Sequence, residues 1–331
     1  MIEDRNDVKN LLEIKDLSVH YVTEDGTVRA LEHLNLELGY GETLGLVGET
    51  GAGKTTTALS ILRLLPTPPS KIIGGEILFD GGDLLKKSLP DMQAIRGKKI
   101  AMIFQDPMTS LNPVIPVNKQ ISEMISLHQD VTDAKALEMA GDMLEIVGIP
   151  AERGVEYPHQ FSGGMKQRVV IAIALACDPM LLIADEPTTA LDVTIQAQVL
   201  KLMRELKAKF NTSMIMITHD LGIVAEMCDK VSIMYAGHII EYAPTERLFN
   251  NHVHPYTEGL FDSLPDLDDE QERLKVIQGL MPDPTDLPEG CTFHPRCKYA
   301  LESCSKHVPE MVEVEPGHFV ACPVRTGGLK E

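Results

Sequence analysis

The stretch GETGAGKT at residues 48–55 decides how the rest of the chain can be interpreted. It has the spacing G-x-x-x-x-G-K-T of a phosphate loop, in which glycines let successive backbone N–H groups turn inward toward phosphate oxygens. The apolar run ETLGLVG (42–48) precedes it, and the helical stretch TTALSILRLL (56–65) follows. A glycine-rich turn with an exposed lysine is the alternative, but the flanking strand and helix favour a phosphate loop.

The loop itself predicts the cofactors. The N-terminus of the following helix adds partial positive charge near the phosphates. Lys54 is expected to reach the β- and γ-phosphates, and Thr55 to offer its hydroxyl to Mg²⁺. We therefore predict that ATP and Mg²⁺ are bound here. The residues predicted to hold them are Gly48, Glu49, Thr50, Gly51, Ala52, Gly53, Lys54, Thr55 and Thr56.

Two carboxylates follow a second buried strand in LLIADEP, residues 181–187. Asp185 stands where a strand-end carboxylate holds Mg²⁺ through water, and Glu186 stands where it can orient and deprotonate an attacking water. Two acidic residues after a strand can also simply cap the next helix. The phosphate loop upstream favours the catalytic interpretation.

A further glycine-rich segment, FSGGMKQR (161–168), leads into an apolar, alanine-rich helix. Ser162, Gly163 and Gly164 would expose backbone N–H groups at its start, which is a second anion-binding helix terminus. One bound ATP does not need two phosphate sites on separate helices. A dimer explains the second site, because it can close on the ATP held by a partner subunit.

Composition limits the functional classes. The formal net charge is −19, whereas a free-standing nucleic-acid binder needs basic surface, so DNA or RNA is a poor candidate partner. The N-terminal stretch MIEDRNDVKNLLEI lacks the features of a signal peptide. The longest apolar run, VVIAIALAC (169–177), is far shorter than the roughly 20 residues needed to cross a bilayer. We expect a cytoplasmic chain that acts on membranes only through other chains.

Patterning predicts an α/β fold. Residues 10–40 alternate apolar and polar, as in antiparallel strands around a turn at Glu24-Asp25-Gly26. The continuous apolar runs 42–48, 180–185 and 213–218 are typical of strands buried on both faces of a parallel sheet. A helical subdomain is expected at about 106–165.

The composition shifts after about residue 240 toward Pro, Asp and Glu. We therefore expect one nucleotide-binding domain over 1–245 and a C-terminal accessory domain over 246–331.

In their order along the chain, these motifs resemble the nucleotide-binding subunit of an ABC transporter, over essentially all 331 residues. The signature Ser162-Gly163-Gly164-Met165, with methionine where many members have glutamine, resembles the peptide-importer branch. The resemblance implies a P-loop ABC-type domain with an antiparallel β subdomain, a helical subdomain and a small C-terminal domain that contains cysteines.

The resemblance also assigns roles to single residues. It implies that Tyr21 stacks on adenine, that Gln105 in IFQDP contacts Mg²⁺ and the attacking water, and that His219 in ITHD contacts the γ-phosphate. Ala190-Leu191-Asp192 resembles the D-loop at the dimer seam. Taken alone, Tyr21 could be an ordinary strand aromatic, Gln105 a surface residue and His219 a capping or core residue.

The resemblance implies an ATPase and translocase subunit that powers import of short peptides. Its partners would be a second ABC ATPase subunit, favoured to be a different chain, two transmembrane permeases and an extracytoplasmic binding protein. The chain would lie at the cytoplasmic face of the membrane. Alternatives are nickel or oligosaccharide as cargo, a soluble ABC ATPase acting on DNA or ribosomes, and a non-catalytic regulatory subunit, against which Glu186 and His219 argue.

Four cysteines stand close together in the C-terminal region, with the spacing C-x5-C-x6-C-x17-C. Four thiolates suit Zn²⁺ or a [4Fe–4S] cluster, although no pair has the short spacing usual for zinc, and four unrelated thiols are the third alternative. HPYTEGL (254–260) followed by CTFHPRC is similar to the C-terminal domain of peptide importers, some of which carry a [4Fe–4S] cluster. That resemblance favours the cluster, with Zn²⁺ as the alternative, on Cys291, Cys297, Cys304 and Cys322.

Three further residues of types that can bind metal, one histidine and two cysteines, are not expected to be ligands. His294 lies in a Phe-His-Pro turn, and Cys177 and Cys228 lie in apolar helical stretches where thiols are usually core residues.

Overall fold

A computed structural model describes residues 10–24, 26–106, 110–189, 191–264 and 276–328. Asp25 and Ala190, named above, lie outside these residues. The chain divides into two compact units that are each discontinuous in sequence. The first unit comprises residues 1–12, 38–43 and 78–217, and the second comprises 13–37, 44–77 and 218–331.

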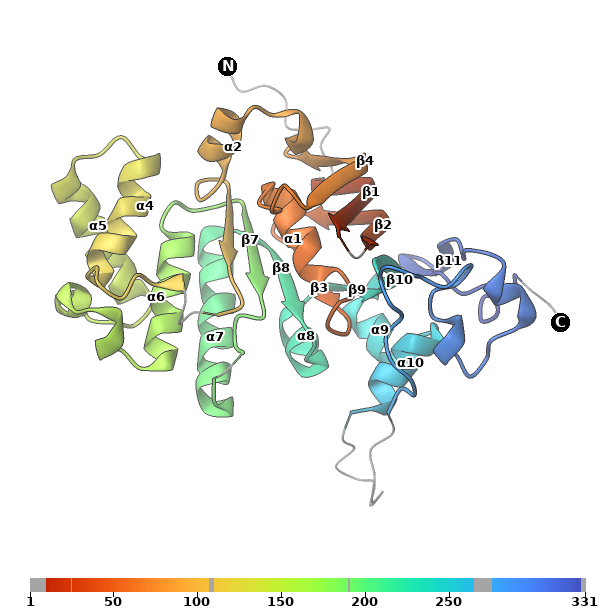
Figure 1. Ribbon diagram of the computed structural model, residues 1–331. Helices are drawn as coiled ribbons and strands as arrows, with labels where there is room; N and C mark the ends of the chain where they lie inside the picture. Colours follow the sequence, from red (N-terminus) through yellow and green to blue (C-terminus); the bar gives the residue numbers. More distant parts are fainter. Residues whose placement is uncertain (1–9, 25, 107–109, 190, 265–275, 329–331) are drawn as a thin grey trace. The chain divides into compact units, whose positions relative to one another are not determined.

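One sheet of the second unit consists mostly of long strands that lie next to one another. β1 (Asn10–Thr23) and β2 (Gly26–Gly39) are joined by the short connection that the sequence predicts, and β1 also neighbours β4 (Ser70–Phe79) (Figure 1). The last residues of β4 pair with β5 (Gly82–Asp83) in the first unit. Alternating burial along β2 is the pattern of a sheet with one covered face.

The second unit also carries the strand that leads into the phosphate loop. β3 (Thr43–Val47) is wholly buried and pairs in parallel with β9 (Lys230–Tyr235), as expected for a strand covered on both faces. β10 (His238–Pro244) runs antiparallel to β9, and β12 (His318–Val320) pairs with β10 and with β11 (Val312–Glu315). The helices are α1 (Lys54–Leu62), α8 (Leu221–Met227), α9 (Thr245–Asn251) and α10 (Pro255–Asp262).

The first unit is built on three parallel strands. β7 (Leu181–Asp185) pairs with β6 (Ile100–Ile103) and with β8 (Ser213–Thr218), and β7 and β8 are fully buried. The expectation of buried parallel strands is therefore confirmed. The helices of this unit are α2 (Leu89–Ile95), α4 (Val117–His128), α5 (Asp133–Ile146), α6 (Gly163–Leu175) and α7 (Val193–Phe210).

Helices α4 and α5 lie side by side within the segment where a helical subdomain is expected (Figure 1). On α5, Ala140 and Leu144 are completely buried, as is Val147 just after it, in agreement with the 3.6-residue periodicity of the sequence. The proposed domain boundaries at 245/246 and around 106–165 stay predictions.

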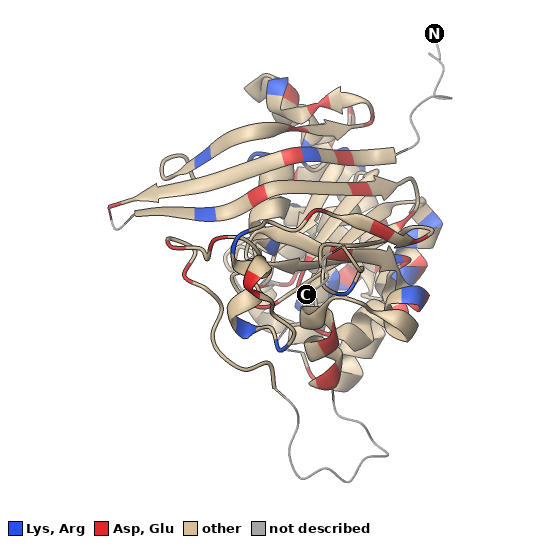
Figure 2. Cartoon of the chain, turned by 90° about the vertical axis from the view of Figure 1, so that its right-hand side faces the viewer, with Lys and Arg blue, Asp and Glu red and all other residues tan. Residues whose placement is uncertain are grey.

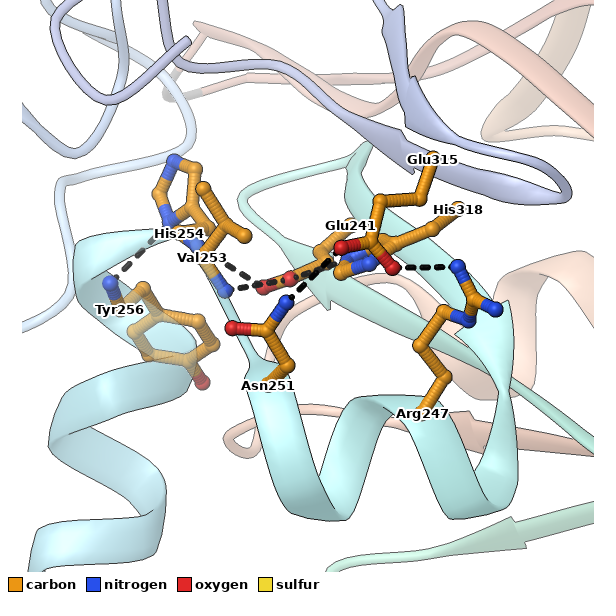
Figure 3. Close-up of polar contacts among 8 residues, drawn as sticks. All are labelled: Glu241, Arg247, Asn251, Val253, His254, Tyr256, Glu315 and His318. Atoms are coloured by element: carbon orange, nitrogen blue, oxygen red, sulfur yellow. Dashed lines mark hydrogen bonds and ion pairs between the residues drawn. The ribbon is translucent and has the colours of Figure 1, made fainter.

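A buried carboxylate ties the segment after β10 to the end of the chain. Glu241, with no exposed surface, accepts hydrogen bonds from the backbone N–H groups of Val253 (2.7 Å) and His254 (3.0 Å) and from Nε2 of His318 (2.8 Å) (Figure 3). Burial alone would raise the pKa of Glu241, but these hydrogen bonds lower it. A buried carboxylate with this many donors is satisfied, so it fixes β10, α10 and β12 together.

His254 is held in its neutral form at the start of α10. Its Nδ1 accepts a hydrogen bond from the backbone N–H of Tyr256 at 3.0 Å, which caps the helix (Figure 3). Burial lowers the pKa of His254 from 6.5 to about 4. A proton on this ring would therefore oppose folding.

The difference between the pKa of His254 in the folded chain and in the unfolded chain predicts that acid lowers the stability of the fold. Because the unfolded chain protonates His254 below about pH 6.5 and the folded chain does so only near pH 4, the free energy of unfolding should fall by up to roughly 3 kcal/mol as the pH drops between them. The variant His254→Asn keeps a capping oxygen but cannot titrate. Urea unfolding at several pH values should give a flatter dependence for the variant; parallel curves for the two proteins would contradict the assignment.

Candidate functional site

The phosphate loop joins β3 to α1, and its glycines are needed for the shape of the backbone. Gly51 and Gly53 have positive φ angles of 87° and 107°. A Cβ atom on Gly53 would also lie 2.7 Å from the carbonyl oxygen of Ala30. Other residues would be strained at both positions, so the glycines keep the loop folded over the start of α1.

Lys54 contacts the phosphate loop, and Tyr21 contacts the first turn of α1. Lys54 is 8% exposed, and its Nζ donates to the carbonyl oxygens of Gly48 (2.6 Å) and Glu49 (2.9 Å), which holds the ammonium against the loop. The hydroxyl of Tyr21 lies 3.5 Å from Oγ1 of Thr56, beside the first turn of α1. The second unit thus brings Tyr21 together with the loop.

His219 belongs to the same unit and follows the last residue of β8. It is exposed, and Asp220 after it caps α8 by accepting from the N–H groups of Gly222 and Ile223. The side chain that caps α8 is therefore that of Asp220.

The first unit brings Gln105 and Glu186 together. Asp185 ends β7 and is 3% exposed, while Glu186 adopts a left-handed φ of 46°. Its carboxylate accepts from Nε2 of Gln105 at 3.1 Å and from the hydroxyl of Thr189 at 2.9 Å. A non-glycine residue in this conformation is strained, and such strain gathers at functional sites, where it aims a side chain. The hydrogen bond between Gln105 and Glu186 brings two predicted site residues together, and their roles stay predictions; Thr189 was not foreseen.

The signature segment begins α6. The Ser162 hydroxyl accepts from the N–H of Met165 at 3.4 Å and caps the helix, and both Ser162 and Gly163 are exposed. A Cβ on Gly164 would lie 2.5 Å from Cγ2 of Ile195 on α7, so this glycine is required by helix packing. The exposed helix start is the part of the segment suited to bind an anion. Of the D-loop residues, Asp192 caps α7 through the N–H of Ile195.

The four C-terminal cysteines line a single small cavity. About 20 Å³ are open inside it. The N–H of Tyr299 donates to Sγ of Cys297 (3.4 Å), and the N–H of Leu301 donates to Sγ of Cys304 (3.5 Å). Its lining includes Cys291, Cys297, Cys304 and Cys322, with Phe293 and His254.

Burial and the neighbouring thiols both change the pKa of the Cys291 thiol. Burial, the largest cause, and the other three thiols together raise the pKa of Cys291 to about 11. Across the described parts of the chain, no group of three or more His, Cys, Asp or Glu side chains is arranged to hold a single metal ion. The four thiols nevertheless line one cavity. His294 also lines this cavity, and its Nδ1 lies 2.8 Å from the carbonyl oxygen of Cys291. Cys228 is buried, as expected for a core thiol, and Cys177 is half-buried.

The structure also shows contacts to the phosphate loop that sequence reasoning missed. The hydroxyl of Tyr256 accepts from the N–H of Glu49 at 3.0 Å, and Arg296 donates to both carboxylate oxygens of Glu49 at 3.2 Å. Both partners lie in motifs that the sequence displays, HPYTEGL and CTFHPRC. Neither motif indicates which part of the protein its polar side chains contact.

Two known families match consecutive parts of the sequence. The family described as "ABC transporter" matches residues 31–189, which include the phosphate loop, the signature segment and Glu186. The family described as "Oligopeptide/dipeptide transporter, C-terminal region" matches residues 240–304, which include Tyr256 and three of the four C-terminal cysteines.

Curated relatives match along nearly the whole chain. The oligopeptide transport ATP-binding protein OppD of Bacillus subtilis is 50% identical over 95% of this chain and 88% of its own length. OppD of Salmonella typhimurium is 49% identical over 94% of this chain and 93% of its own. A probable peptide ABC transporter ATP-binding protein of Sinorhizobium fredii is 51% identical over 94% of both chains.

Solved structures share the fold. The chain matches cbiO1 of Clostridium perfringens, described as part of the ABC transporter complex cbiONQ, with 28% identity and a TM-score of 0.64 over 74% of this chain and 92% of that one. It also matches a dimeric ATP-binding cassette in a post-hydrolysis state with ADP and Pi, with 24% identity and a TM-score of 0.63 over 71% and 98%. The predicted P-loop α/β fold is confirmed.

Proposed function

The chain belongs to the ABC transporter family of ATP-binding proteins, and from that premise we propose that it hydrolyses MgATP to power the import of short peptides through separate permease subunits. The observation that carries peptide as the cargo is the match of residues 240–304 to the C-terminal region of oligopeptide and dipeptide transporters. This region lies beyond the ATPase motifs, so it separates the peptide branch from ABC ATPases in general.

Binding of the nucleotide falls mainly to the second unit. Lys54 neutralises phosphate charge, Thr55 contributes its hydroxyl to Mg²⁺, and Tyr21 stacks on adenine. The inward N–H groups of residues 48–55 take the phosphate oxygens, and the dipole of α1 adds to their effect. Support comes from the geometry of the loop and from the place of Tyr21 beside Thr56.

Hydrolysis depends on the carboxylates of the first unit. Asp185 serves Mg²⁺, and Glu186 takes a proton from the attacking water, while Gln105 orients both the water and the carboxylate. His219 contacts the γ-phosphate, and Ser162–Gly164 close on the ATP of a second ATPase subunit. The hydrogen bonds of Gln105 and Thr189 support this role, because they aim the Glu186 carboxylate before substrate arrives.

The other partners of the proposed importer are two transmembrane permeases and an extracytoplasmic binding protein. Among the described helices, none is long and apolar enough to cross a membrane. The chain would therefore act peripherally at the cytoplasmic face, with a second ATPase subunit that is a different chain. Gln105 and the helical segment that follows it would carry motion to the permeases.

Nickel and oligosaccharides are the alternative cargoes, and DNA or ribosomes the alternative targets. The net charge of −19 disfavours nucleic acid. Figure 2 shows Lys and Arg positions mixed with Asp and Glu positions along the long strands.

We further propose that the cysteine cavity holds a [4Fe–4S] cluster, with Zn²⁺ as the alternative. Four thiol donors around one cavity, with backbone N–H groups directed at two of the sulfurs, fit such a group. The ligands would be Cys291, Cys297, Cys304 and Cys322. A bound cluster would cross-link a loop-rich part of the chain that contains few regular elements.

Replacing the proposed base tests the hydrolytic mechanism. Glu186→Gln should lower the turnover of ATP by at least about 100-fold, because the amide cannot accept a proton, while MgATP binding is retained. The matched control is Glu205→Gln on α7, whose carboxylate is 62% exposed and pairs only loosely with Lys201 at 3.9 Å. The control should turn over ATP like the wild type. Turnover by Glu186→Gln at the wild-type rate would refute the role of Glu186.

Metal analysis tests the cofactor. The chain purified without oxygen should contain about four irons and four sulfides and absorb near about 400 nm. Cys297→Ser should lose iron, and Cys177→Ser, outside the cavity, should keep it. One zinc without colour would establish the alternative, and a chain without metal would leave the cavity a cluster of unrelated thiols.

A further inference from the structure

Glu49, the second residue of the phosphate loop, is held by two groups of the C-terminal region. Its backbone N–H donates to the hydroxyl of Tyr256, and its carboxylate pairs with Nη1 of Arg296. All three residues belong to the second unit. The C-terminal region therefore contacts the loop through one hydrogen bond to its backbone and one ion pair with its side chain.

The guanidinium of Arg296 is also held by groups other than Glu49. Its side chain is only 7% exposed, Nε donates to the carbonyl oxygen of Gln278 at 3.0 Å, and Nη1 also donates to the hydroxyl of Tyr235 at 3.3 Å. The carboxylate of Glu49 is 30% exposed. This ion pair is much less screened by water than a surface pair, so removing its cation leaves a poorly solvated negative charge.

The same contacts continue to the cysteine cavity. Tyr235, Tyr256 and Phe293 form a ring cluster with centroids 4.7, 5.2 and 5.4 Å apart. Phe293 lines the cavity between Cys291 and Cys297 in sequence, and Arg296 directly precedes Cys297. On the other side, Tyr256 follows His254, the residue anchored by Glu241 (Figure 3).

We propose that Tyr256 and Arg296 are positioning residues for the phosphate loop, which couple the cysteine cavity to the affinity for MgATP. The inference rests on the proposed ATPase function. Arg296 neutralises the carboxylate of a phosphate-loop residue, and Tyr256 accepts a hydrogen bond from the backbone of the same residue. A change in the cysteine segment that moves Phe293 or Arg296 would shift both contacts.

Coupling between two sites is reciprocal. If the cavity influences nucleotide affinity, MgATP must influence the cavity. In the chain stripped of metal, bound MgATP should therefore slow alkylation of Cys291 and Cys297 by iodoacetamide, and the protection should disappear when Arg296 is replaced. This readout does not depend on turnover.

The direct test measures the Kd of MgATP for the full chain by calorimetry. Arg296→Met should weaken binding about tenfold, equal to about 1.4 kcal/mol, with little change in kcat at saturating ATP. Arg296→Lys should stay within about threefold of the wild type, because it keeps the charge. Glu49→Gln should restore most of the affinity in the Arg296→Met background, since it removes the unpaired carboxylate.

A matched control comes from the same segment. Lys298→Met removes a cation paired with Glu258 at 2.9 Å, but its side chain is 56% exposed and this pair does not include the loop. It should leave the Kd unchanged. Where Arg296→Met fails to fold, Tyr256→Phe tests the backbone contact alone and should weaken binding by a smaller factor.

The results separate this inference from the proposed function. A wild-type chain that neither binds nor hydrolyses ATP would overturn the function. A chain that does both, with an unchanged Kd in Arg296→Met or Tyr256→Phe, would overturn the inference. Lower thermal stability in Arg296→Met, with unchanged Kd and unchanged protection of the thiols, would show that Arg296 only supports the fold.

Discussion

The phosphate loop must keep successive backbone N–H groups turned inward, and the second unit is organised around that constraint. Gly48 lies against β9 so closely that a Cβ would come within 2.2 Å of the carbonyl oxygen of Met234. The N–H of Gly237, in the turn after β9, donates to the carbonyl oxygen of Ala52 at 2.9 Å. Tyr256 and Arg296 hold the loop at Glu49. A loop fixed on several sides needs little reorganisation when phosphate binds, which is the basis of electrostatic preorganisation.

The first unit orients the carboxylate that is proposed to act in hydrolysis. A carboxylate that activates water must be aimed, and Glu186 is aimed by its left-handed backbone and by hydrogen bonds from Gln105 and Thr189. Because β7 and β8 are parallel, their carboxyl ends lie at one edge of the sheet, where Asp185 pairs in register with Ile217. The strands thus carry Asp185 and the residues that follow it to that edge, where open α/β sheets usually bind their ligands.

Local motifs could be predicted from the sequence, and tertiary contacts could not. The loop and the buried strands are encoded by short patterns of glycine and apolar residues, so both were foreseen. The assignment of Gly164 to anion binding stays a prediction, and the structure adds a close contact with Ile195, which depends on how α6 crosses α7. Tyr256 and Arg296 were visible in quoted motifs, yet their contact with Glu49 depends on long-range packing that no local pattern encodes. The four thiols line one cavity, as a shared site requires, and their role as ligands stays a prediction. Their spacing in the sequence does not fix the distances between them in the fold.

Uptake of a labelled short peptide by cells that lack this chain tests the central claim most directly. The account predicts that uptake is lost without the chain, returns with the wild-type chain and does not return with Lys54→Ala, because the variant lacks the ammonium that neutralises phosphate charge. Uptake of nickel and of an oligosaccharide, measured in the same cells, should be unaffected. Peptide uptake that continues without the chain, while nickel or oligosaccharide uptake stops, would contradict the account.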